Sequence, residues 1–132
     1  MEARGVAEVD QAFAAMAAQG VDGLFGVSDS TLIGGDPTPP RILELITRHR
    51  LPSVSDEGDF AREGGLLSLG VDDVAIGRGA ADYIHRILRG AMPGELPVVR
   101  SKLALAVNLR TAAALGITIP PVILLRADEV IE

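Results

Sequence analysis

The C-terminal sequence NLRTAAALGITIPPVILLRADEVIE, residues 108–132, carries the clearest structural signals of this 132-residue chain. Asn108 is a residue type that caps helices, and four apolar side chains follow it at helical spacing. Gly116 is placed to end this helix, and the pair Pro120 and Pro121 then breaks the chain. The tail therefore predicts a short capped helix, a break, and a second apolar turn before an acidic end.

The rest of the chain alternates between short apolar runs and longer segments with an apolar stripe at helical spacing. Strands are expected at residues 23–27, 52–55 and 65–69, and at one or both of 96–99 and 103–107. Helices are expected at residues 6–18, from Pro40 onwards, at 58–63, and at Asp73–Leu88 with Asp72 or Asp73 as its cap. This alternation predicts one α/β domain over residues 1–132, with a mainly parallel sheet and helices on both faces.

Composition limits the partners and cofactors of the chain. The net charge of −6 argues against a nucleic acid partner, and aromatic residues make up only 3%. The chain has no Cys, and its two histidines, His49 and His85, lie far apart without metal-ligand spacing, so no metal or cofactor is expected. No apolar run reaches the roughly 18 residues of a membrane span. The N-terminus lacks a charged start followed by an apolar core, so a complete chain would be cytoplasmic.

The sequence does not predict an enzyme. It has neither a G-x-S-x-G turn nor a phosphate-binding P-loop, and the Gly77-Arg78-Gly79 stretch sits inside a helical pattern. Neither histidine has a Ser or Cys partner in a recognisable motif.

Four segments, in order, resemble the ABC-transporter substrate-binding proteins of the tryptophan/tyrosine type. They are QAFAAMAAQGVDGLFGVSD, RILELITRHRLPSVSDEGDFAREGGLLSLGVD, AADYIHRILRGAMPGELPV and the tail quoted above. The resemblance implies one lobe, the second, of a two-lobed periplasmic binding protein of type I. It also implies export, a small-molecule ligand such as an amino acid held between lobes, and a partner ABC permease. Family members often carry aromatic or Arg residues where this chain has the acidic stretch Asp56 to Asp59, which leaves the identity of the ligand open. Many relatives also have Tyr where this chain has Leu69, so a ligand or hinge contact of that Tyr would be lost here.

Three expected loops follow strands and are candidates for ligand binding, because ligands of open α/β sheets sit beyond the carboxyl ends of the strands. Their hydroxyl and carboxylate groups suit an ammonium group or a hydroxyl. The candidate ligand-binding residues are Ser28, Asp29, Ser30, Thr31, Asp56, Glu57 and Ser68. The same residues also suit local turns, and Asp56 or Glu57 also suits a helix cap.

The helix Asp73–Leu88 carries apolar side chains that need a partner. The resemblance implies that this helix packs on a first lobe. In the chain taken alone, it must fold back on its own sheet or bury itself in another molecule, and the expected solution is a homodimer through this helix.

Three functions are compatible with these observations. The first is the solute-binding component, or a fragment of it, of an ABC-type importer. The second is a remnant or regulatory small-molecule-binding module without a transport role. The third is an interaction domain that has no ligand.

Overall fold

The computed structural model describes residues 6–27, 40–99 and 101–132 of the chain. Its strands are β1 (Leu24–Gly26), β2 (Ser53–Ser55), β3 (Leu67–Val71), β4 (Leu103–Asn108) and β5 (Glu129–Ile131). Its helices are α1 (Val6–Ala18), α2 (Pro40–Arg48), α3 (Asp73–Leu88), α4 (Leu109–Leu115) and α5 (Pro121–Leu124), with a 3-10 helix η1 (Pro93–Glu95).

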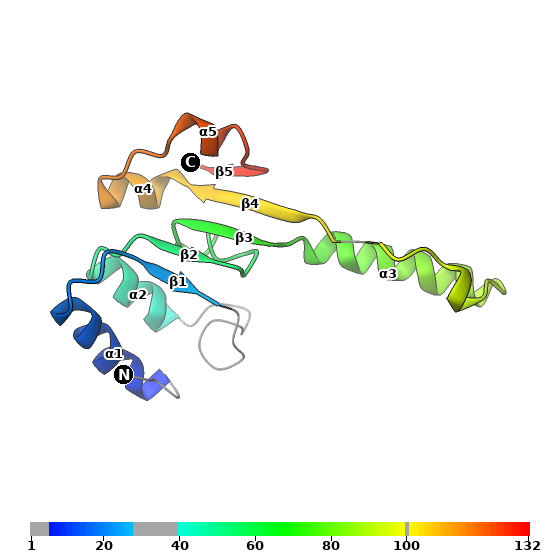
Figure 1. Cartoon of the computed structure of the whole chain (residues 1–132), viewed down its shortest axis with the longest axis horizontal. Helices are drawn as coiled ribbons and strands as arrows, with labels where there is room; N and C mark the ends of the chain where they lie inside the picture. The colour runs from blue at the N-terminus through cyan, green and yellow to red at the C-terminus, as the bar shows by residue number, and fades with distance from the viewer. Residues whose placement is uncertain (1–5, 28–39, 100) are drawn as a thin grey trace.

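The five strands form one sheet in the order β1-β2-β3-β4-β5, with helices on both faces (Figure 1). β1, β2 and β3 are parallel, β4 runs antiparallel to β3, and β5 is parallel to β4. One apolar core joins α1 and α2 to Phe60, and a second joins α4 and α5 to β4. The predicted α/β fold with a mainly parallel sheet is thus confirmed.

The C-terminal tail folds as its sequence predicts. The side chain of Asn108 accepts a hydrogen bond from the Thr111 N–H at 3.0 Å, which caps α4. Gly116 follows α4 with φ 72°, a left-handed conformation that favours glycine. The amide of Asn108 also donates to the Ala61 carbonyl at 2.8 Å, so the cap ties the tail to the turn after β2.

The predicted helix at residues 58–63 is wrong, because this segment forms successive turns. Its N–H groups donate to carbonyls three, four and five residues back: Phe60 to Glu57, Glu63 to Asp59, and Gly65 to Phe60. A helix needs a run of consecutive bonds of one kind, which this segment does not have. We call residues 56–64 the site turn.

Of the later strand candidates, one forms and the other does not, as the prediction allowed. Residues 96–99 form no strand, and the single later strand of the predicted pair is β4. Pro97 has no N–H to donate to the hydrogen bonds of a sheet, and β3 and β5 already occupy both sides of β4, so residues 96–99 have no free strand edge there to pair with. The short strand β5 was not expected, because three residues that include Glu129 carry little local signal.

Helix α3 projects from the end of the sheet as an arm, and the chain returns along it before β4 begins (Figure 1). Asp72 caps the helix by accepting a hydrogen bond from the Ala75 N–H at 2.9 Å. The hydroxyl of Tyr83 donates to the Pro97 carbonyl and holds the return segment. No residue of α3 is buried in the described structure, so the helix does not fold back on its own sheet.

Candidate functional site

A pocket of about 510 Å³ opens where β2 and β3 end and β4 begins. The antiparallel pairing of β3 with β4 places the start of β4 at the same edge as the carboxyl ends of the parallel strands. We call this hollow the edge pocket. It is lined by Asp56, Glu57, Gly58, Leu69, Gly70, Val71, Asp73 and Leu103.

Three aliphatic residues, which we call the aliphatic floor, line the edge pocket on the face of the sheet opposite the site turn. Val71 and Leu103 are directly opposed across β3 and β4, and Leu69 lies on the same face of the sheet two residues before Val71. All three side chains are exposed, with 54% of Leu103 accessible to solvent. A ligand with an apolar body would remove this surface from water, which is favourable at roughly 25 cal/mol per Å².

The rim of the edge pocket is acidic. Asp56 and Glu57 come from the site turn, and Asp73 from the first turn of α3. Among the described residues that line the pocket, none is Lys, Arg or His. Carboxylates placed in this way favour a cationic group on the ligand.

Hydrogen bonds to serines of the sheet hold the site turn in place. The hydroxyl of Ser55 accepts from the Glu57 N–H at 3.1 Å, and the hydroxyl of Ser68 donates to the Gly58 carbonyl at 2.9 Å. Below the turn, Gly70 leaves room for close backbone approach: a Cβ there would lie 2.6 Å from the Asp56 carbonyl oxygen. The turn that carries the acidic rim thus sits directly on β3.

The structure brings together some of the predicted site residues and separates others. Asp56 and Glu57 line the edge pocket. Ser68 is fully buried and bonded to Gly58, so its side chain serves the site turn and does not reach the open edge. The predicted residues Ser28, Asp29, Ser30 and Thr31 lie outside the described residues.

The aliphatic floor was missing from the predicted site. Leu69 and Val71 alternate with buried small residues on β3, a period of two that indicates one shared face. Leu103 has no such local signal, because it joins them only through the pairing of β4 with β3.

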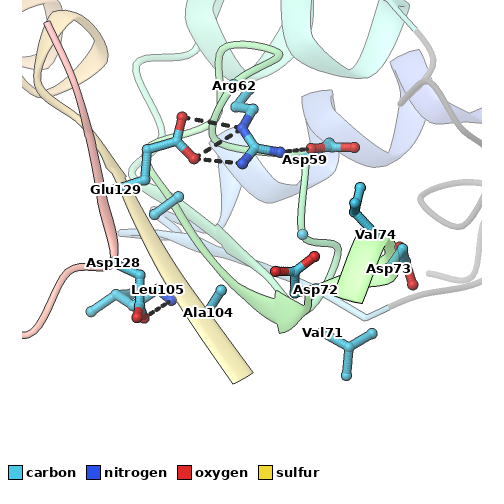
Figure 2. A pocket seen from close by; sticks show the side chains of 12 residues that line it. Asp59, Arg62, Val71, Asp72, Asp73, Val74, Ala104, Leu105, Asp128 and Glu129 are labelled. Atoms are coloured by element: carbon cyan, nitrogen blue, oxygen red, sulfur yellow. Dashed lines mark hydrogen bonds and ion pairs between the residues drawn. The ribbon is translucent and has the colours of Figure 1, made fainter. Parts of the chain in front are cut away.

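A second, smaller pocket of about 270 Å³ lies beside the site turn (Figure 2). Figure 2 shows the Arg62 side chain reaching to Glu129 of β5 and to Asp59. The hydrogen bonds with Glu129, and then those with Asp59, raise the pKa of Arg62 above its usual range. These pairs connect the site turn to the last strand of the sheet.

An ion pair also joins the start of β4 to the start of β5. Lys102 contacts one carboxylate oxygen of Asp128, and the other oxygen accepts from the Leu105 N–H at 3.0 Å. The bond from Lys102, and then the bond from Leu105, hold the pKa of Asp128 below its usual 3.8. The same pair raises the pKa of Lys102 above its usual 10.5.

Replacing Asp128 with Asn is expected to lower the melting temperature between about pH 5 and pH 9. The depressed pKa of Asp128 means that its contribution is present above 3.8 and is lost as the pH falls through the folded-state pKa. The raised pKa of Lys102 means that its contribution is lost as the pH rises through the folded-state pKa above 10.5. Melting curves from below pH 3.8 to above pH 10.5 should show a gap between the two proteins that is full in the middle of the range and narrows at both ends. Asp22→Asn, at an exposed acid, is the control, and a gap that stays constant as the pH falls below 3.8 would contradict the assignment.

In residues 6–27, 40–99 and 101–132, every helix is too short or too polar to cross a lipid bilayer. In the same ranges, no group of three or more His, Asp or Glu side chains is arranged to hold a metal ion.

The chain is similar to solved structures of larger proteins, and it covers about two fifths of each of them. A conserved domain protein from Vibrio cholerae is 30% identical, with a TM-score of 0.73 over 97% of this chain and 42% of that chain. An ABC domain from Streptococcus pneumonia in complex with L-Trp is 27% identical, with a TM-score of 0.77 over 99% of this chain and 43% of that chain. The ligand-free, open structure of a substrate-binding protein with adhesive properties from Clostridium difficile is 21% identical, with a TM-score of 0.66 over 95% of this chain and 41% of that chain, and shows a shared fold alone.

The sequence comparisons add a family match. No curated protein sequence matches the chain. The sequence profile of the family described as "ABC transporter substrate binding protein" matches residues 1–131. The chain spans about two fifths of the length of the solved structures to which it is similar. Because the profile covers nearly every residue, this chain belongs to the family of ABC transporter substrate-binding proteins.

Proposed function

We propose that the edge pocket binds a small solute that has an ammonium group and an apolar body, such as an amino acid. The observation that carries this proposal is the pocket of about 510 Å³ at the carboxyl ends of the strands, whose lining combines the acidic side chains of the rim with the aliphatic side chains of the floor. Asp56 and Glu57 would receive the ammonium group, and Leu69 and Leu103 would contact the apolar body. The L-Trp bound to the Streptococcus relative supports an amino acid as the ligand class.

The proposed site extends to residues 28–31. β1 runs parallel to β2, so the chain that follows Gly26 leaves the sheet at the same edge as Asp56. The side chains of Ser28, Asp29, Ser30 and Thr31 would add hydroxyl and carboxylate acceptors to the acidic rim.

The chain would act as the solute-binding component of an ABC-type importer. In this proposal it works with a membrane permease, in the periplasm or outside the cell, as one α/β lobe that resembles the second lobe of a two-lobed protein. One lobe covers one side of a small ligand, whereas efficient pockets bury roughly 70–90% of it. We therefore expect the isolated chain to bind with a dissociation constant of about 1 mM.

Three probes with the same branched tail test the proposed ligand class. Isoamylamine carries only the ammonium group, leucine carries both charges, and 4-methylpentanoate carries only the carboxylate. Calorimetric titration should detect isoamylamine and leucine, while 4-methylpentanoate should bind at least about tenfold more weakly, because the acidic rim repels it. Equal binding of the amine and the acid would contradict the proposed role of the rim.

A charge-neutral double variant tests the residues. Asp56→Asn with Glu57→Gln should weaken binding of isoamylamine by about tenfold, which is the contribution expected from a charge-assisted hydrogen bond. Glu95→Gln, at an exposed acid of η1, should leave binding unchanged. If none of the three probes binds the unaltered chain, a role as an interaction domain without a ligand is favoured instead.

A further inference from the structure

Arg62 is the one cation of the site turn, whose other charged residues are all acids. It lines the smaller pocket, which we call the arginine pocket, and it does not line the edge pocket. The two pockets are neighbours, because Gly58, Val71 and Asp73 line both of them. A guanidinium inside the edge pocket would compete with a cationic solute for the acids there. The contacts that hold Arg62 in the arginine pocket therefore bear on which solute can bind.

Two carboxylates occupy all three nitrogens of the Arg62 guanidinium (Figure 2). Its Nε lies 2.9 Å and its Nη2 lies 2.6 Å from the same oxygen of Glu129, while Nη1 donates to Asp59. This fork geometry fixes the direction of the guanidinium as well as its place. Asp59 belongs to the same turn as Arg62, whereas Glu129 belongs to β5. Glu129 is thus the residue that anchors the guanidinium to a separate strand of the sheet.

The register of the strands places Glu129 on the face of the site turn. Glu129 pairs with Ala106 of β4, and Ala106 pairs with Ser68 of β3. Paired residues point to the same face of a sheet, so Glu129 lies on the face where the Ser68 hydroxyl holds the Gly58 carbonyl. The side chain of Ala106 between them is small, which leaves the Glu129 carboxylate a path to Arg62.

Without Glu129, the acid best placed to receive Arg62 is Asp73. Two other acids that line the arginine pocket already have partners, because Asp72 caps α3 and Asp128 is bonded to the start of β4. Asp73 has no ion pair among the described residues, and it lines both pockets. A guanidinium paired with Asp73 would bring a positive charge to the acidic rim.

We infer that Glu129 is a specificity-determining residue of the edge pocket, because it holds the Arg62 cation in the arginine pocket and keeps the rim negatively charged. Glu129 does not line the edge pocket, so it acts through Arg62 as a positioning residue. The inference rests on the proposed solute site. It adds that the preference for cationic over anionic solutes is set from the last strand of the sheet.

Glu129→Gln tests the inference by calorimetric titration of isoamylamine and 4-methylpentanoate. Loss of the carboxylate should let Arg62 reach the rim, so the amine should bind more weakly and the acid more tightly. The ratio of the two dissociation constants should change by at least about fivefold, which is the effect of one nearby charge. A variant that only loosened the site turn would weaken both ligands, so changes of opposite sign are the signature of a repositioned cation.

A double variant and a matched control complete the titration. Adding Arg62→Gln to Glu129→Gln should restore the ratio of the unaltered chain, because the released cation is then absent. Asp10→Asn is the control, since Asp10 also accepts from the Nε and Nη2 of an arginine, Arg41, but lines neither pocket. An unchanged ratio in Glu129→Gln would overturn the inference, and so would a ratio that the double variant does not restore.

The position of Arg62 can also be measured without a ligand. The Nε–H of Arg62 should exchange with water at least about tenfold more slowly in the unaltered chain than in Glu129→Gln, because Glu129 accepts from it, and nuclear magnetic resonance measures both rates. If none of the probes binds the unaltered chain, the proposed function fails and this inference fails with it. If the probes bind but the two exchange rates are equal, this inference alone fails.

Discussion

Replacing Phe60 with alanine is expected to lower the free energy of unfolding by about 3–5 kcal/mol, the range for large aromatic truncations in a core. Phe60 is 1% exposed and sits in the core with Phe13 of α1 and Leu45 of α2. Gly65 lacks a side chain where the Phe60 ring lies, so the ring occupies a space that the chain leaves for it. Its removal would leave a cavity under the site turn.

Chemical denaturation of the Phe60→Ala and Phe25→Ala variants should show that the two phenylalanines contribute differently to the free energy of unfolding. Phe25 is 66% exposed on β1, and we expect its replacement to cost less than about 1 kcal/mol. Phe60 belongs to the same turn as Asp56 and Glu57, so the Phe60 variant should also lose solute binding at temperatures where it remains folded. Similar losses of stability in the two variants would show that the described core does not support the turn.

The Gly70→Ala substitution is expected to destabilise the protein by about 1–3 kcal/mol and to distort the edge pocket. A Cβ at Gly70 would lie 2.5 Å from the Gly58 nitrogen and 2.6 Å from the Asp56 carbonyl oxygen. Both atoms are backbone, so no side-chain rotation can relieve the contact. The site turn must move away from β3, and the bond from Ser68 to the Gly58 carbonyl must lengthen or break.

Gly94→Ala is the matched control for this prediction. A Cβ at Gly94 meets nothing within 4 Å, and its replacement should change stability by less than about 0.5 kcal/mol. Thermal melts of the two variants, with titration of isoamylamine, would report stability and site geometry together. A Gly70 variant with unchanged stability and unchanged affinity would contradict the close approach of the site turn to β3.

Local sequence signals predicted most of the secondary structure. The cap at Asn108, the left-handed Gly116 and the start of a helix at Pro40 each depend on residues within a few positions of one another. The failed helix at residues 58–63 shows the limit of such signals. Its acidic start resembles a helix cap. The carbonyl of Ala61 in that segment, however, accepts a hydrogen bond from the side chain of Asn108, which is 47 residues away in the sequence.

The family resemblance and the alternating pattern were enough to predict an α/β lobe with a mainly parallel sheet, and to place Asp56 and Glu57 at the edge where the parallel strands end. Tertiary structure alone decided which side chains share the edge pocket. Leu103 reaches Val71 because β4 reverses direction and pairs with β3, while Ser68 turns into the core because side chains alternate across a strand. Strand pairing joins residues that are far apart in sequence, and its register determines which face each side chain occupies. That register depends on contacts over the whole sheet, which no local pattern of residues specifies.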